Sequence, residues 1–252
     1  MSRRQRPPPR RRLHRLGRSG SAPQQSRLGS DRSETSQSLQ RHTSNRRRAA
    51  ACSIVAVWPH HDLTRARELF ATNEPRDVFY RAATYLVAKA LDAEAPVSVS
   101  EALSVLLQTW NRPYYQYRPL TPDHYEQIDV VLTKHADWLA SARARSIDSF
   151  SKADASALEN VFADFEEVLG PVGAAKALHL LAPEFLPLWD RAIAVAYGLA
   201  LGSTGSNGPR YVRLALIAKD QAEKVGGKPA LGRNVLKAID EYNYCRFTKG
   251  WM

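Results

Sequence analysis

The chain of 252 residues has few of the residues that build disulfide frameworks, metal centres and membrane spans. Its two cysteines, Cys52 and Cys245, are too few for a disulfide framework or a four-cysteine zinc site, which favours a reducing compartment. No apolar run approaches the roughly 18 residues of a membrane-spanning helix. It has no metal-ligand motif and no glycine-rich nucleotide-binding loop. We therefore expect a cytoplasmic protein with no cofactor, no metal and no membrane partner.

Acidic residues are nearly absent from the first 50 residues, which hold 14 arginines against Asp31 and Glu34. The whole chain has a net charge of +11, so residues 51–252 carry a net charge of −1. A segment so poor in apolar residues cannot bury enough surface to offset its ordering entropy. We expect residues 1–50 to be a disordered basic tail and residues 51–252 to be one folded domain. A nucleic-acid site on that domain must come from a local patch.

Several interpretations of the tail stay open. Its arginines suit the phosphates of a nucleic acid. Its composition, rich in Arg and Ser and poor in acids, also resembles a transit peptide. The segment could equally be a weakly constrained extension, or it could lie upstream of the true translation start.

The periodicity of the remaining chain is helical almost throughout, and no segment alternates like a strand. One apolar stripe contains Phe79, Ala83, Leu86, Val87 and Ala90. Ser98 and Glu101 form a capping box, and Thr121-Pro122 begins a helix expected to run to residue 142. Residues 172–181 are apolar almost all round, which predicts a buried helix. We expect an all-α fold of eight or nine helices.

The stretch from Leu169 to Ile193 carries most of the chemistry. Gly170 and Gly173 flank a turn between two predicted helices, where glycine permits a positive φ and close backbone approach. The free N–H groups at the start of the following helix, Val172 included, suit a phosphate. The alternative is an ordinary helix–helix turn.

Three ionisable residues follow this turn. Lys176, in an otherwise apolar helix, either snorkels outward or is desolvated, which would lower its pKa and make it nucleophilic. His179, one turn further, fits a core histidine as well as a pocket residue. Asp190 stands at a predicted N-cap. Its carboxylate either caps the helix only or also stabilises a sugar cation and orients a water molecule.

An aromatic segment over residues 110–119 is predicted to be a loop after a helix. Flipped bases need stacking faces and amides that read their edges, and phosphates need arginine. The candidate base-pocket residues are Trp110, Asn111, Arg112, Tyr114, Tyr115, Tyr117, His179 and Trp189. The alternative for the segment is an aromatic loop packed on the core. The aromatic C-terminus, residues 240–247, is interpreted mainly as core.

Together these residues resemble the helix-hairpin-helix DNA glycosylase superfamily. In that family a glycine-rich hairpin binds the DNA backbone, and a catalytic Asp begins a helix after the second hairpin helix. The resemblance implies that Gly170, Val172 and Gly173 bind the backbone, that Asp190 is catalytic, and that Lys176 matches the lysine of bifunctional members. The chain departs from the pattern at Pro171 and in the short separation between Lys176 and Asp190.

The leading hypothesis is therefore a monomeric DNA glycosylase that acts on double-stranded DNA carrying a modified base, with lyase activity if Lys176 is a nucleophile. A more specific hypothesis is a bacterial anti-phage enzyme that excises a base such as glucosylated hydroxymethylcytosine. The alternatives are a non-catalytic nucleic-acid-binding module and a helical protein-interaction module.

Overall fold

A computed structural model describes residues 60–94 and 96–252 of the chain. The expected basic tail, residues 1–50, and Cys52 lie outside the described residues. The described residues form helices and no strand, as the all-α prediction requires. The α-helices are α2 (His60–Asn73), α3 (Asp77–Leu91), α4 (Val99–Trp110), α5 (Arg112–Tyr115), α6 (Pro122–Lys134), α7 (Ala136–Arg143), α8 (Ala155–Leu181), α9 (Arg191–Ala196), α10 (Gly208–Lys224), α11 (Gly227–Leu231) and α12 (Val235–Asn243).

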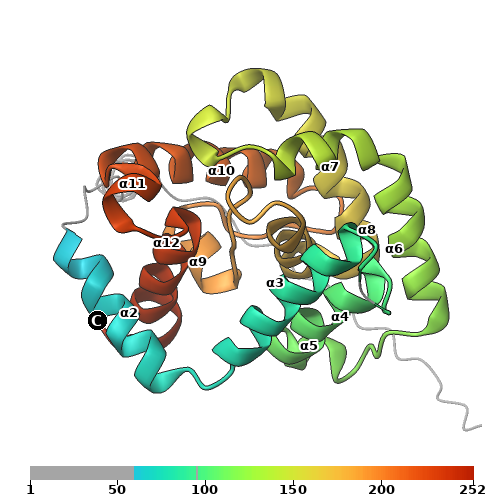
Figure 1. Ribbon diagram of the computed structural model, residues 1–252, viewed down its shortest axis with the longest axis horizontal. Helices are drawn as coiled ribbons and strands as arrows, with labels where there is room; N and C mark the ends of the chain where they lie inside the picture. The colour runs from blue at the N-terminus through green and yellow to red at the C-terminus, as the bar shows by residue number, and fades with distance from the viewer. Residues whose placement is uncertain (1–59, 95) are drawn as a thin grey trace, which may run out of the picture. The chain divides into compact units, whose positions relative to one another are not determined.

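Three short elements complete the described chain. Two are 3-10 turns, η1 (Ile147–Ser149) and η2 (Lys152–Asp154), and the third is a π-helical segment, η3 (Tyr244–Lys249). Among the helices, α3 packs along α4, α10 along α8, and α12 along α2. Figure 1 shows the C-terminus beside α2. The sulfur of Cys245 in η3 contacts the backbone oxygen of Ala66 in α2 at 3.4 Å.

The described part of the chain has eleven α-helices rather than the expected eight or nine. The helix expected to run from residue 121 to 142 is two helices, because the backbone of His135 (φ −112°, ψ 16°) leaves the helical region between α6 and α7. The segment expected as a loop after residue 110 contains the four-residue helix α5. Helices this short carry too few residues to show a period in the sequence.

Local signals for helix starts are confirmed elsewhere. The hydroxyl of Ser98 accepts from the N–H of Glu101 at 3.2 Å, and the Glu101 carboxylate accepts from the Ser98 N–H at 2.7 Å. This reciprocal pair is the predicted capping box of α4. Pro122 is the first residue of α6, where its missing N–H costs no helical hydrogen bond.

Helix α8 is broken at Gly170, which has φ 69° and ψ 168°. Only glycine adopts this region readily. A Cβ added there would also lie 3.1–3.3 Å from the Tyr114 ring and hydroxyl. Beyond the break, every residue from Gly173 to Leu181 is buried, which confirms the predicted buried helix. The break therefore redirects the chain so that its most apolar segment enters the core.

We predict that Gly170→Ala lowers the free energy of unfolding by about 1–3 kcal/mol, because alanine adds backbone strain and crowds Tyr114. Denaturant unfolding of the purified variant measures this loss. Gly198→Ala is the control, since Gly198 also has φ 69° but no atom lies within 4 Å of its added Cβ. Equal losses in the two variants would show that crowding against Tyr114 is unimportant.

Candidate functional site

Asp190 is the N-cap residue of α9, as predicted, and its side chain is partly exposed. One carboxylate oxygen accepts from the N–H of Ile193 at 2.8 Å. The other accepts from the hydroxyl of Thr248 in η3 at 2.7 Å. One donor three residues away in α9 and one in η3 thus fix the orientation of this carboxylate.

Lys176 is desolvated rather than snorkelling, with 6% of its surface exposed. Its ammonium donates to the backbone oxygen of Trp110 at 2.8 Å. Burial lowers the pKa of Lys176 to about 8, although the negative charges of Asp190 and Asp240 oppose the shift. The buried amine and the Asp190 carboxylate therefore belong to one electrostatic environment.

The glycine turn lies against two tyrosines of the aromatic segment. A Cβ on Gly173 would lie 2.9 Å from the Tyr115 hydroxyl, and one on Gly170 would lie 3.1 Å from the Tyr114 hydroxyl. The Tyr115 hydroxyl donates weakly to the backbone oxygen of Leu169 at 3.4 Å. Gly170 and Gly173 are buried and Val172 is half-buried. The glycines thus permit close packing of α5 on the turn.

The aromatic segment divides between the interior and the surface. Trp110 ends α4 and stacks on Tyr80 at 5.5 Å between ring centroids. Its indole N–H donates to the backbone oxygen of Arg76 at 2.9 Å. Tyr115 is buried, whereas Tyr117 is 80% exposed. Asn111 and Tyr114 are half-buried and Arg112 is exposed. Burial therefore divides the segment, with Tyr115 in the interior and Arg112 and Tyr117 at the surface.

His179 is held between two partners inside the core. Its Nε2 lies 2.9 Å from the Tyr80 hydroxyl, and its Nδ1 lies 2.7 Å from the backbone oxygen of Leu186. A neutral ring satisfies both contacts, with Nδ1 donating and Nε2 accepting. Burial lowers the pKa of His179 to about 4.

Trp189 is almost fully buried. Its indole N–H donates to the backbone oxygen of Pro171 at 3.0 Å, which ties the residue before Asp190 to the glycine turn. Its ring meets Phe162 and Tyr211 edge-on. Trp189 thus holds the glycine turn close to the start of α9.

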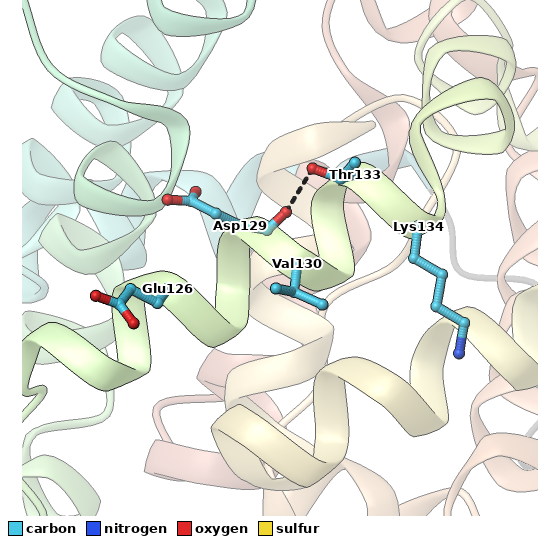
Figure 2. Close-up of a pocket in the computed structure, with 5 residues that line it drawn as sticks. All are labelled: Glu126, Asp129, Val130, Thr133 and Lys134. Carbon is cyan, nitrogen blue, oxygen red and sulfur yellow. Dashed lines mark hydrogen bonds between the residues drawn. The ribbon is translucent and has the colours of Figure 1, made fainter.

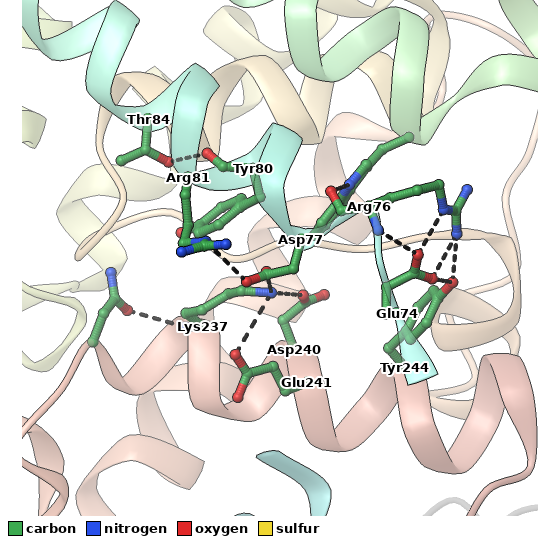
Figure 3. A network of polar contacts seen from close by, with 12 residues as sticks. Glu74, Arg76, Asp77, Tyr80, Arg81, Thr84, Lys237, Asp240, Glu241 and Tyr244 are labelled. Carbon is green, nitrogen blue, oxygen red and sulfur yellow. Dashed lines mark hydrogen bonds and ion pairs between the residues drawn. The ribbon is translucent and has the colours of Figure 1, made fainter. Parts of the chain in front are cut away.

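A buried charged cluster surrounds Lys237 of α12 (Figure 3). Its ammonium lies 3.5–3.8 Å from three carboxylates, those of Asp77, Asp240 and Glu241. The same nitrogen lies 4.2, 4.6 and 5.0 Å from three ring centroids, those of Phe70, Tyr80 and Trp110. A desolvated cation gains most from aromatic faces. The cluster therefore joins α2, α3, α4 and α12 around one charge.

Asp240 connects this cluster to the Asp190 environment. It is buried, and burial raises its pKa to about 6; the charge of Lys237 opposes the shift, while the charges of Asp190 and Glu241 add to it. Asp240 and Asp190 thus differ in solvation, because Asp240 is buried and Asp190 is partly exposed.

A second network stands beside the cluster (Figure 3). Both nitrogens of the Arg76 fork donate to the Glu74 carboxylate at 2.7 Å, and Arg76 also donates to the Tyr244 hydroxyl at 2.8 Å. The Tyr244 hydroxyl donates to Glu74 at 2.5 Å. Hydrogen bonds from Arg76 are the main reason that the pKa of Glu74 falls to about 2. This network holds η3 against the connection between α2 and α3.

The sequence did not single out the residues at the centre of this arrangement, which are Glu74, Arg76, Asp77, Tyr80, Lys237 and Thr248. The one available signal is the spacing of Lys237, Asp240 and Glu241, which fits ion pairs at i,i+3 and i,i+4. That spacing usually marks an exposed helix face, so burial of the set is visible only in the fold.

Two further findings concern other sites in the described part of the chain. No group of three or more His, Cys, Asp or Glu side chains there is placed to hold a metal ion. The surface of α6 has an open depression (Figure 2), and none of the predicted site residues lines it. It is lined by Glu126, Asp129, Val130, Thr133 and Lys134.

Comparison with known proteins gives no relative for this chain: no protein-family model, curated protein or solved structure matches it. Among the described residues, no helix combines the length and apolar character needed to cross a bilayer.

We predict that acid destabilises the wild type more than His179→Gln. The folded pKa near 4 lies below the ordinary 6.5, so between these values the unfolded state binds more protons. Stability is therefore lost as the pH falls from about 6.5 to 4, on the order of 3 kcal/mol.

Asp240 acts in the opposite direction in this range, because its pKa is raised and its stabilisation grows as pH falls. Its effect is common to both proteins and cancels in the comparison. Urea unfolding at several pH values measures the difference. Parallel stability curves for the wild type and His179→Gln would contradict the neutral, buried state assigned to His179.

Proposed function

We propose that this protein is a DNA glycosylase that flips a modified base out of duplex DNA and hydrolyses its N-glycosidic bond. One observation carries the proposal: the carboxylate of Asp190 is fixed at the start of α9 by Ile193 and Thr248, and it follows the buried amine of Lys176 in the chain. Both follow the glycine break in α8. This order of elements is the one for which the sequence resembles helix-hairpin-helix glycosylases, with residues 170–173 as the hairpin.

The geometry of Asp190 suits stabilisation of a sugar cation. Ile193 and Thr248 each occupy one lone pair, so each carboxylate oxygen keeps acceptor capacity for the substrate. As the base departs with the bonding electron pair, positive charge develops at C1′, which a fixed carboxylate stabilises. Asp190 then accepts a proton from the attacking water, whose hydroxyl adds to C1′ and leaves an abasic site.

The remaining predicted site residues have separate roles in this proposal. In the 170–173 turn, Gly170 and Gly173 are packed against α5 and Pro171 has no N–H, so the N–H of half-buried Val172 is the group that holds a DNA phosphate at a helix start. Asn111, Arg112 and Tyr117 are at least partly exposed and reach the DNA from outside. We further propose that the substrate carries a bulky modified base, such as glucosylated hydroxymethylcytosine of phage DNA, and that the enzyme acts as a monomer in the bacterial cytoplasm.

For Lys176 we favour the role of a charge partner over that of a nucleophile. Its nitrogen is buried and donates to the carbonyl of Trp110. As an ammonium ion it balances the negative charges of Asp190 and Asp240. A nucleophilic amine must instead leave this position and be neutral when it attacks C1′.

We predict that Asp190→Asn reduces base excision at least about a hundredfold, since an amide cannot replace the carboxylate charge or accept the proton. Fold and cap are retained, because Asn caps helices nearly as well as Asp. The assay incubates the full chain with end-labelled duplexes and with phage DNA carrying modified cytosines. Alkali then converts abasic sites to strand breaks.

The matched control is Asp123→Asn, which removes one carboxylate from the first turn of α6. Excision by this control should equal that of the wild type. Salt-dependent DNA binding without abasic sites on any substrate would replace the proposal with a non-catalytic binding module. Neither binding nor excision would leave Asp190 as a helix cap alone.

We predict that the single-turnover excision rate falls as the pH rises through about 8, because Lys176 then loses its proton and its charge. Lys176→Met should be slower and should lack this decline. A rate that instead rises through pH 8, together with a borohydride-stabilised protein–DNA cross-link that Lys176→Met abolishes, would assign Lys176 as a nucleophile.

A further inference from the structure

Three exposed cations lie on the two elements that meet at Asp190, and none has a carboxylate partner in the described part of the chain. Arg191 follows Asp190 directly, and Arg246 and Lys249 lie in η3. The hydrogen bond from Thr248 to Asp190 places η3 at the start of α9, and α9 and η3 pack on each other. None of the three cations forms an ion pair with a described acid.

Two of these cations rest on aromatic rings. The Arg246 guanidinium lies 5.8 Å from the ring centroids of both Tyr242 and Phe247. The Lys249 ammonium lies 5.6 Å from the Tyr244 ring and 5.8 Å from the Trp251 ring. A ring face orients a cation but accepts few of its N–H donors, which stay available for an anion. Within the described residues, one N–H donor of Arg246 is used, by the Tyr242 hydroxyl at 2.9 Å.

Several cations on other elements have carboxylate partners, whereas others, such as Arg118 over the Tyr114 ring, have none among the described residues. Eight of these cations pair with carboxylates, which offsets their charge at the surface. These are Arg81, Lys89, Lys134, Arg143, Arg145, Lys219, Lys224 and Lys228. With residues 51–252 near neutrality, a polyanion requires local positive charge, which the three cations of α9 and η3 can supply next to Asp190.

We propose that Arg191, Arg246 and Lys249 form a phosphate-binding surface that holds the DNA backbone beside the nucleotide attacked at Asp190. The inference rests on the proposed function, because it takes DNA as the partner. The stacked cations are already oriented, so less side-chain entropy is lost when phosphates bind. Binding through this surface is expected to be independent of base sequence.

The test compares two full-length triple variants that each lose three positive charges. The first is Arg191→Gln/Arg246→Gln/Lys249→Gln, and the charge-matched control is Lys89→Gln/Lys224→Gln/Lys228→Gln, which removes paired cations. Binding to an unmodified duplex is measured between about 50 and 200 mM salt. Arginines of residues 1–50 contribute equally to all three proteins and cancel in the comparison.

We expect the first variant to bind at least about tenfold more weakly at low salt, with the slope of log K against log salt reduced by about 3. The control should retain the wild-type slope. Equal losses in the two triple variants overturn the proposal. Loss of binding to phosphatidylserine vesicles with unchanged DNA binding also overturns it and assigns the surface to a membrane.

The excision assay separates this inference from the proposed function. If the wild type makes no abasic sites but only the first triple variant loses the salt-dependent binding, the surface stands and the glycosylase proposal falls. If excision occurs and the first variant binds DNA like the control, the glycosylase stands and the surface falls.

Discussion

The buried ammonium of Lys237 is the constraint on which the arrangement of the site depends. Removing a cation from water is unfavourable unless other groups replace its hydration. Three carboxylates and the rings of Phe70, Tyr80 and Trp110 supply that replacement. Because these groups come from α2, α3, α4 and α12, the charge can be accommodated only when all four helices are in place. The cluster thus links burial of a charge to the packing of the fold.

Trp110 connects the cluster around Lys237 to the candidate site. Its ring faces Lys237, while its backbone oxygen accepts from Lys176. The positions of two buried ammonium groups are thereby coupled through one residue at the end of α4. From Lys176 the electrostatic environment extends to Asp190 and Asp240. Thr248 of η3 also holds Asp190, so the C-terminal segment forms part of the candidate site.

Sequence patterns predicted the elements whose causes are local. The capping box at Ser98, the N-cap at Asp190 and the buried second half of α8 each depend on residues within a few positions of one another. Predictions were poorer where either of two adjacent aromatic residues could have faced the core. The expected stripe of α3 began at Phe79, which is 39% exposed, whereas Tyr80 beside it is buried and contacts His179. Periodicity does not distinguish two adjacent aromatic residues when the partner helix is unknown.

The sequence by itself determined the all-helical class, the glycine break at residue 170 and the cap at Asp190, because backbone sterics and hydrogen bonds within one turn act over a few residues. The tertiary structure alone decided that Lys176 is desolvated, that Tyr115 and His179 are internal, and that Lys237 meets Phe70 and Trp110. The contacts of Lys237 with Phe70 and Trp110 join residues more than a hundred positions apart. Burial and charge are properties of the assembled neighbours, and no local pattern encodes which neighbours a side chain will have.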